Sequence, residues 1–305
     1  MSIKTPLSKY LELEWSPYMK YPIPSSIDYQ FDEKNADDYC FSRTPKRRNC
    51  ISKVEIKTFN CWNIDNLITA NQVKLYVNVI KSHFDNQTNP TIFFLQGIQS
   101  DLKNELFATY PDNIVFSEIY GVNTERIDLA NITYVPDYKD RYCATIWSDD
   151  YILTQSIIPS YMDKPHLGRR TSDWLVLQYK NNVFESIAIT NIWLSPQKRN
   201  VKKEKPIHIL QSILEDAEIL NKDFGWKIIV AGTFNMIPDI IREYVNDINL
   251  EHINIDKTTI QYISQKMLEK PRHVDYALFW GFTNIIENII AINMSYHSMV
   301  HYACQ

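Results

Sequence analysis

Short runs of β-branched and aromatic residues that alternate with amphipathic stretches constrain the fold of this chain more than any other feature of its sequence. Such runs, bounded by polar and turn-forming residues, are typical of strands. Apolar residues at three-to-four spacing predict helices over 71–84 and 205–223. Many strands with few helices predict an α/β or α+β sandwich, with two sheets inside and helices outside. We expect strands in the segments VEIKTFNCWNI (54–64), TIFFLQGI (91–98), RYCATIWS (141–148), YILTQSII (151–158), DWLVLQY (173–179), ESIAITNIWL (185–194), KIIVAGTF (227–234), VDYALFWG (274–281) and NIIENIIAI (284–292).

The periodic segments begin near Ile51 and continue to the end of the chain. With 305 residues, 45% of them hydrophobic, the sequence can bury one large core. Residues 1–50 are polar and turn-rich and lack sustained periodicity. We interpret 1–50 as an N-terminal lead-in that packs on a single domain formed by 51–305.

Charge and cysteine usage exclude several classes of protein. The formal net charge of -4 gives no global positive field that would recruit nucleic acid, so any such binding needs a local patch. The 5 cysteines are scattered and form no CxxC pair, which favours reduced thiols. No apolar run has the length of a signal peptide core or of a membrane span. We therefore expect a cytoplasmic protein with no membrane partner.

Polar residues stand where the predicted strands end, which is where α/β proteins place their binding sites. These are Asn60 and Asn63 in TFNCWNID, Gln96 in FFLQGIQ, Asn191 and Trp193 in TNIWLSP, Thr233 and Asn235 in VAGTFN, Asp275 in HVDYALF and His297 in SYHSM.

The serial order of TFNCWNID, FLQGIQSDL, TNIWL, IIVAGTFN, VDY and SYH resembles the landmarks of the endonuclease/exonuclease/phosphatase superfamily. It is most similar to the tyrosyl-DNA-phosphodiesterase-2-like fungal branch, which would read TWNID, FLQE, NTHLES, AGDFN, MDKVFF and TDH. The resemblance covers roughly residues 54 to 300. It implies a four-layered α/β sandwich, two mixed β-sheets flanked by helices, whose strand ends hold a divalent metal, usually Mg²⁺, for phosphodiester hydrolysis.

Some family positions are kept in this sequence. The asparagine of WNID corresponds to Asn63, with Asn60 as an alternative register, and the asparagine of GDFN corresponds to Asn235. The resemblance also implies that Asp275 orients His297, the histidine of TDH. This pair is a chemically sensible general base or acid, although it could equally be a relict hydrogen bond that holds two strands together.

The acidic positions of the family are not kept. The glutamate of LQE is replaced by Gly97, the aspartate of GDFN by Thr233 and the aspartate of TDH by Tyr296, while Trp193 replaces the histidine of THLES. Mg²⁺ binds through acidic oxygens, and a neutral amide such as that of Gln96 substitutes poorly for a carboxylate. The sequence therefore predicts a degenerate active site that binds no metal and needs no cofactor.

A basic segment follows the strand that ends near Trp193. It carries Lys198, Arg199, Lys202, Lys203 and Lys205. On the rim that the resemblance implies, these charges would hold a nucleic-acid backbone, and Trp193 would add a stacking face. The alternative interpretation is a solvated loop that leads into a helix. Arg169 and Arg170 stand where the family often has an arginine before a strand, and their role stays open.

We therefore predict a pseudoenzyme that acts by binding nucleic acid (RNA or DNA) or a protein. It would be an immunity- or antitoxin-type inhibitor of a nuclease toxin, or a protector of nucleic acid. The chain is rich in Ile, Asn and Lys but has only 6 Gly, a bias of AT-rich genomes that would suit an immunity protein of a yeast killer plasmid. The alternatives are an active divalent-metal (Mg²⁺) phosphodiesterase or nuclease with a rebuilt site, and a scaffold protein.

Overall fold

The computed structural model describes residues 53–61, 70–85, 87–119, 141–163, 169–194, 206–236, 238, 241, 273–292 and 297–305. The predicted lead-in, 1–50, lies outside these residues, so the predicted domain organisation stays a prediction.

The described residues form two mixed β-sheets. In the six-stranded sheet, whose order is β10-β11-β1-β2-β4-β3, β1 and β2 are parallel and the other neighbours are antiparallel. In the five-stranded sheet, whose order is β5-β6-β7-β8-β9, only β7 and β8 are parallel. The strands are β1 (Val54–Asn60), β2 (Thr91–Ile98), β3 (Ile114–Ile119), β4 (Arg141–Trp147), β5 (Tyr151–Ile157), β6 (Trp174–Tyr179), β7 (Asn182–Trp193), β8 (Lys227–Thr233), β9 (Asp275–Trp280), β10 (Ile286–Ile290) and β11 (Met299–Cys304).

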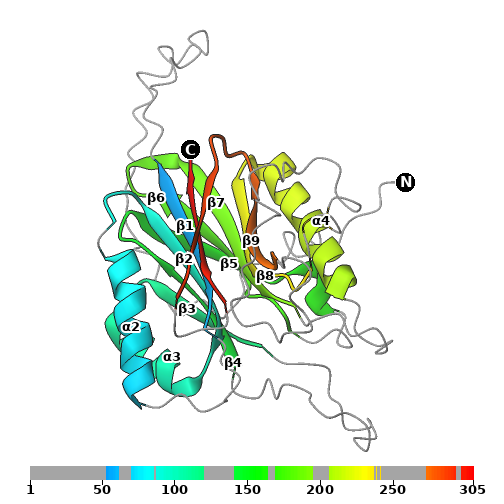
Figure 1. Cartoon of the computed structure of the whole chain (residues 1–305). Coiled ribbons are helices and arrows are strands. Elements are labelled where there is room, and N and C mark those ends of the chain that lie inside the picture. The colour runs from blue at the N-terminus through cyan, green and yellow to red at the C-terminus, as the bar shows by residue number, and fades with distance from the viewer. Residues whose placement is uncertain are drawn as a thin grey trace, which may run out of the picture. The chain divides into compact units, whose positions relative to one another are not determined.

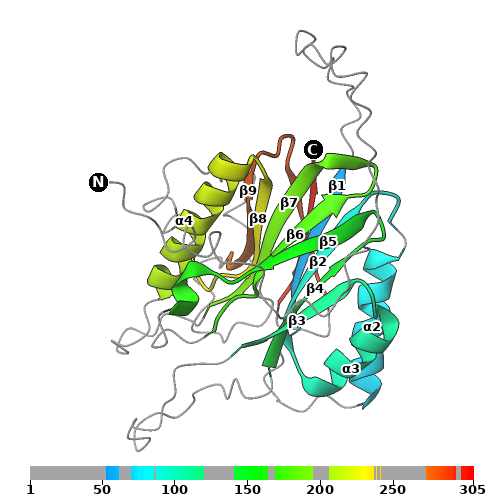
Figure 2. The same ribbon diagram turned by 180° about the vertical axis from the view of Figure 1, so that it is seen from behind.

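Helices cover the outer faces of the two sheets (Figures 1 and 2). Helices α2 (Ala70–Phe84) and α3 (Ser100–Thr109) lie beside the six-stranded sheet, while α4 (Pro206–Phe224) lies beside the five-stranded sheet. A short 3₁₀ helix, η3 (Ser160–Asp163), packs next to α4. The predicted sandwich of two mixed sheets flanked by helices is confirmed. Among the described helices, none is long and apolar enough to cross a membrane.

Strand β1 is buried on both faces, and its side chains alternate between the core under the helices and the core between the sheets. Val54 and Ile56 belong to the core between the sheets, whereas Phe59 and Cys61 pack in the core under α2 and α3. Because side chains alternate along a strand, Thr58 and Asn60 also turn toward the second sheet. The same strand therefore supplies apolar packing at its start and polar groups at its end.

The predicted segments correspond to observed elements, but besides the short η3, two strands and one α-helix were missed. These are β3, α3 and β11. Strand β3 carries an exposed Glu118 beside a buried but polar Ser117, and its Val115 and Phe116 are only partly buried, so its apolar pattern is weak. Helix α3 buries only Leu102 and Leu106, which is too short a stripe to stand out from the sequence.

Gly232 allows the ends of β7 and β8 to approach closely. Its φ is 142°, and a Cβ placed on it would lie 2.0 Å from the backbone oxygen of Ile192. Ile192 and Gly232 are direct partners in the parallel ladder. A side chain here would therefore push apart the two strands that lead into the polar cluster described below.

Lys57 is a charged residue in the middle of a buried strand, with only 2% of its surface exposed. Its Nζ donates to the backbone carbonyl of His83 at the end of α2, where the helix dipole favours a cation. Burial lowers the pKa of Lys57 to about 8, against an opposing contribution from Glu55. The burial of His83 itself lowers the pKa of this histidine, and the nearby charges of Lys57 and His301 lower it further.

Gly232→Ala is expected to lower the free energy of unfolding by more than about 3 kcal/mol, because the added methyl overlaps a backbone atom. Gly225→Ala is the matched control: Gly225 also has a positive φ, of 68°, but a Cβ there would meet nothing within 4 Å. The control should lose only about 1–2 kcal/mol. Urea unfolding of both variants measures the difference, and equal losses would contradict the close approach.

Lys57 should make a contribution to stability that grows with pH above about 8. Its pKa in the folded protein, about 8, is below its usual 10.5, so between these values this residue binds more protons in the unfolded chain. The contribution should increase by as much as a few kcal/mol over this window, since one pKa unit is about 1.4 kcal/mol. The buried thiols of Cys61, Cys143 and Cys304, whose pKa is raised, act in the opposite direction above about pH 9, so the contribution of Lys57 is measured as a difference between variants. In Lys57→Met this increase should disappear, whereas Lys74→Met, at an exposed position of α2, should keep it. Urea titrations at a series of pH values would test this.

Candidate polar cluster at the strand ends

Four polar side chains at the strand ends form one chain of hydrogen bonds between the two sheets. Asn60, at the end of β1, donates from Nδ2 to Oγ1 of Thr233, 2.9 Å away. Thr233, at the end of β8, donates its hydroxyl to Oδ1 of Asp275 over 2.6 Å. The other carboxylate oxygen, Oδ2, lies 2.7 Å from Nδ1 of His297 and accepts a hydrogen bond from it. We call these four residues the strand-end cluster.

Thr233 is the centre of the strand-end cluster. Its hydroxyl accepts one hydrogen bond and donates another, so both of its roles are used. Asn60, Thr233 and Asp275 are each at most 1% exposed. A buried carboxylate requires partners, and Asp275 has one on each oxygen.

A second set of neutral side chains joins the sheets beside this cluster. Gln96 of β2 donates from Nε2 to Oδ1 of Asn191 (2.8 Å) and to Oγ1 of Thr58 (3.1 Å). Asn191 in turn donates to the backbone carbonyls of Leu95 (3.0 Å) and Ala144 (2.8 Å). Gln96 and Asn191 are fully buried. Gln96, the polar residue of the motif FFLQGI, therefore links the two sheets.

Gly97 has a backbone that a glutamate would not readily adopt. Its φ is 70°, in the left-handed region where glycine has no steric cost. The pairing of β2 with β4 is irregular between Leu95 and Ile98, which is where this residue lies. A glutamate at this position would therefore strain the backbone that the structure shows.

Asn235 follows β8 in a left-handed conformation, with φ of 53°. Asparagine tolerates this region better than most residues. Its Nδ2 donates to the carbonyl of Leu194 over 2.5 Å, and the amide of Leu194 donates to the carbonyl of Thr233 over 2.9 Å. Asn235 thus fastens the chain beyond β7 to the chain beyond β8.

Trp193 is buried rather than displayed. Its side chain packs with Ile119 and Cys143, and only 5% of the residue is exposed. The prediction that it offers a face for base stacking is therefore wrong: the ring fills the space between the sheets. Its backbone amide donates to the carbonyl of Arg170 over 2.8 Å.

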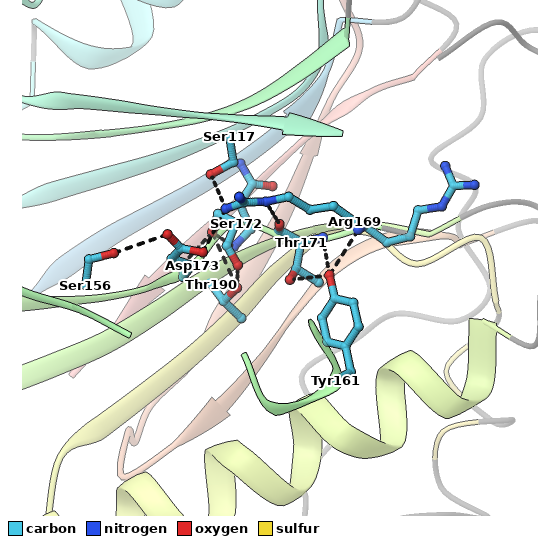
Figure 3. A network of polar contacts seen from close by, with 10 residues as sticks. Ser117, Ser156, Tyr161, Arg169, Thr171, Ser172, Asp173 and Thr190 are labelled. Carbon is cyan, nitrogen blue, oxygen red and sulfur yellow. Dashed lines mark hydrogen bonds and ion pairs between the residues drawn. The ribbon is translucent and has the colours of Figure 1, made fainter. Parts of the chain in front are cut away.

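The segment that carries Arg169 and Arg170 is held by a tyrosine that the sequence did not identify (Figure 3). The hydroxyl of Tyr161, in η3, accepts from the backbone amides of Arg170 and Thr171, each over 3.0 Å. Arg169 forms an ion pair with Asp173 at 2.7 Å. Arg169 also donates to Oγ of Ser117 in β3 over 3.4 Å, so it joins its own segment to the six-stranded sheet. No local sequence pattern predicts this role of Tyr161, because the backbone amides that it contacts lie 9 and 10 residues further along the chain.

Several predicted site residues lie outside the described residues. These are Asn63, Tyr296 and the basic residues Lys198, Arg199, Lys202, Lys203 and Lys205. Of the two registers considered for the asparagine of the first strand, the structure places Asn60 in the strand-end cluster. Thr233, Asp275 and His297 are brought together, while Gly97, Trp193 and Asn235 lie at neighbouring strand ends.

The donor set in the described part of the chain does not fit Mg²⁺. In the strand-end cluster the acid is Asp275, and both of its oxygens already accept hydrogen bonds. Within the described ranges, no group of three or more His, Cys, Asp or Glu residues is arranged to hold a metal ion. Mg²⁺ prefers carboxylates and water in near-octahedral geometry, which a threonine, one amide and one carboxylate already engaged on both oxygens do not supply.

No family model matches this sequence, and no curated protein matches it. Solved structures of the same fold do match. Truncated Caenorhabditis elegans TDP2 shares 12% identity over 83% of this chain and 97% of its own, with a TM-score of 0.56. D. rerio TDP2, complexed with a single strand DNA product, shares 11% identity over 83% and 99%, with a TM-score of 0.57. An endonuclease/exonuclease/phosphatase from Bacteroides vulgatus shares 13% over 83% and 99%, with a TM-score of 0.56. The predicted endonuclease/exonuclease/phosphatase-like fold is thereby confirmed.

Thr233→Val should lower the free energy of unfolding by about 2–3 kcal/mol, because it removes the donor to Asp275 and the acceptor of Asn60 while keeping the volume. Thr233→Ser keeps the hydroxyl and should lose about 1 kcal/mol or less. Urea unfolding measures both. A valine variant no less stable than the serine variant would show that the hydroxyl does not hold the cluster together.

Proposed function

We propose that this protein is a catalytically degenerate form of the endonuclease/exonuclease/phosphatase fold that acts by binding, without metal-dependent hydrolysis. The observation that supports this most directly is Thr233. At a position where the resemblance implies a metal-binding aspartate, a neutral hydroxyl donates to Asp275 and accepts from Asn60. The oxygens of Asp275 thus find their hydrogen-bond partners within the protein.

The Asp275–His297 pair alone is a weak basis for hydrolysis of a phosphodiester. General acid or base help contributes about 10²–10⁴-fold, whereas phosphoryl transfer depends mainly on electrostatic stabilisation of the transferred group. Carboxylates that would place a dication beside that group are replaced by Gly97 and Thr233. The pair therefore supports binding and strand pairing better than turnover.

The ligand that we propose is single-stranded nucleic acid. D. rerio TDP2, which has the same fold, is complexed with a single strand DNA product. In the sequence the basic segment 198–205 follows β7, whose last residue, Trp193, pairs with Thr233. Its lysines and Arg199 would hold phosphates through charge, in a salt-dependent manner. An immunity- or antitoxin-type role toward a nuclease would be one use of such binding and stays a prediction.

The alternative function is an active phosphodiesterase with a rebuilt metal site. The contact that favours it is the 2.7 Å hydrogen bond between His297 and Asp275, which keeps the arrangement of a base and its orienting acid.

Binding should persist without a divalent cation. We expect a single-stranded oligonucleotide to bind equally in EDTA and in Mg²⁺ or Mn²⁺, with no product from that oligonucleotide, from RNA or from 5′-tyrosyl-DNA. Fluorescence anisotropy and gel analysis of the products provide the two readouts. Metal-dependent product formation that His297→Ala abolishes would replace the proposed function by the alternative one.

The basic segment should carry most of this affinity. Replacing Lys198, Arg199, Lys202 and Lys203 by Gln should weaken binding more than about tenfold at low salt and flatten its salt dependence. Replacing Lys46, Arg47 and Arg48 by Gln is the control, because it removes a similar charge from the predicted lead-in. Equal losses in both variants would point to unspecific charge attraction.

A further inference from the structure

Strand β5 forms an outer edge of the five-stranded sheet. It pairs with β6 on one side, and no other described strand pairs with it on the other. None of the described helices lies over it (Figure 2). The unpaired edge of a strand is a row of amide and carbonyl groups that can accept another strand.

Apart from the bulge between Leu153 and Gln155, this edge lacks the protection that natural edge strands usually carry. Charged residues and proline, which block edge-to-edge pairing, are absent from Tyr151–Ile157. Ile152 and Ile158, at the two ends of the segment, are 49% and 52% exposed, and the residues between Leu153 and Ile157 are exposed as well. By contrast, the edge strand β3 presents the exposed charge of Glu118.

The sequence of this edge is nearly the same in both directions. Residues 152–158 read ILTQSII, centred on Gln155. If two copies of the segment ran antiparallel across a two-fold axis at Gln155, Ile152 would face Ile158 of the other copy. Leu153 would face an isoleucine, Thr154 would face a serine, and Gln155 would face itself. Matched apolar pairs and hydroxyl pairs stabilise neighbouring strands.

We propose that β5 is the interface between two copies of this chain, paired antiparallel across a two-fold axis at Gln155. Self-complementarity is the requirement of an isologous interface, and ILTQSII meets it residue by residue. The bulge between Leu153 and Gln155 lies next to the axis, so both copies contribute the same local twist. The two five-stranded sheets then continue into one another, and the strand-end cluster plays no part in the contact.

A charge placed on the axis tests this arrangement. Gln155→Lys puts two lysines opposite one another and Gln155→Glu puts two glutamates opposite one another, so each variant should dissociate at least about tenfold more readily than the unmodified protein. An equimolar mixture of the two variants should form a mixed dimer, because lysine then faces glutamate. Sedimentation equilibrium of the full chain, from about 1 to about 100 µM, measures the dissociation constants of the unmodified protein, of the two variants and of their mixture.

Asn288→Lys and Asn288→Glu are the control pair, since Asn288 is an exposed residue of another edge strand, β10. They should leave the dissociation constant unchanged. A protein that stays monomeric over the whole concentration range overturns the proposal, and so does a dimer that the Gln155 variants leave intact. A mixture that remains monomeric overturns the two-fold axis at Gln155. Circular dichroism of each variant checks that the fold is kept.

Discussion

The hydrogen bond from Thr233 to Asp275 is the interaction on which the arrangement of the strand ends depends. It fixes the buried carboxylate from one side while His297 fixes it from the other. Because Thr233 also accepts from Asn60, the same hydroxyl ties the six-stranded sheet to the five-stranded sheet. A buried anion is tolerated only with such partners. The cluster is therefore self-sufficient, and its carboxylate needs no bound cation to remain buried.

The hydrogen bonds beside the strand-end cluster are made by neutral side chains. Gln96 and Asn191 satisfy one another and the carbonyls of Leu95 and Ala144. Amide-to-amide and amide-to-carbonyl bonds carry no net charge, so they hold the sheets together at any pH at which the protein is folded. In a metal enzyme of this architecture, converging acids would repel one another until a cation arrived. Here the amide side chains of Gln96 and Asn191, which are neutral, help to hold the two sheets together.

Periodicity in the sequence was enough to predict a sandwich of two sheets and the helix over 205–223, because buried strands such as TIFFLQGI and KIIVAGTF show it directly. The endonuclease/exonuclease/phosphatase-like fold was predicted from the order of the short motifs at the strand ends. The polar residues at strand ends were also foreseeable, since each follows an apolar run. The residues that these side chains contact could not be predicted. That Thr233 faces Asn60 rather than solvent, or that Trp193 is covered by Ile119 and Cys143, depends on pairing between distant strands. Tyr161 acts through backbone amides, which leave no trace in composition.

The geometry at Gly97 bears on the history of this chain. Its φ of 70° lies at the irregularity between β2 and β4, where a side chain would strain the main chain. On the proposed function, Gly97 and Thr233 stand at two acidic positions of the fold, and a glutamate introduced at position 97 would meet a backbone that disfavours it. Restoring one acid without the other would then give little advantage. Selection on such a chain would act on what its surface binds.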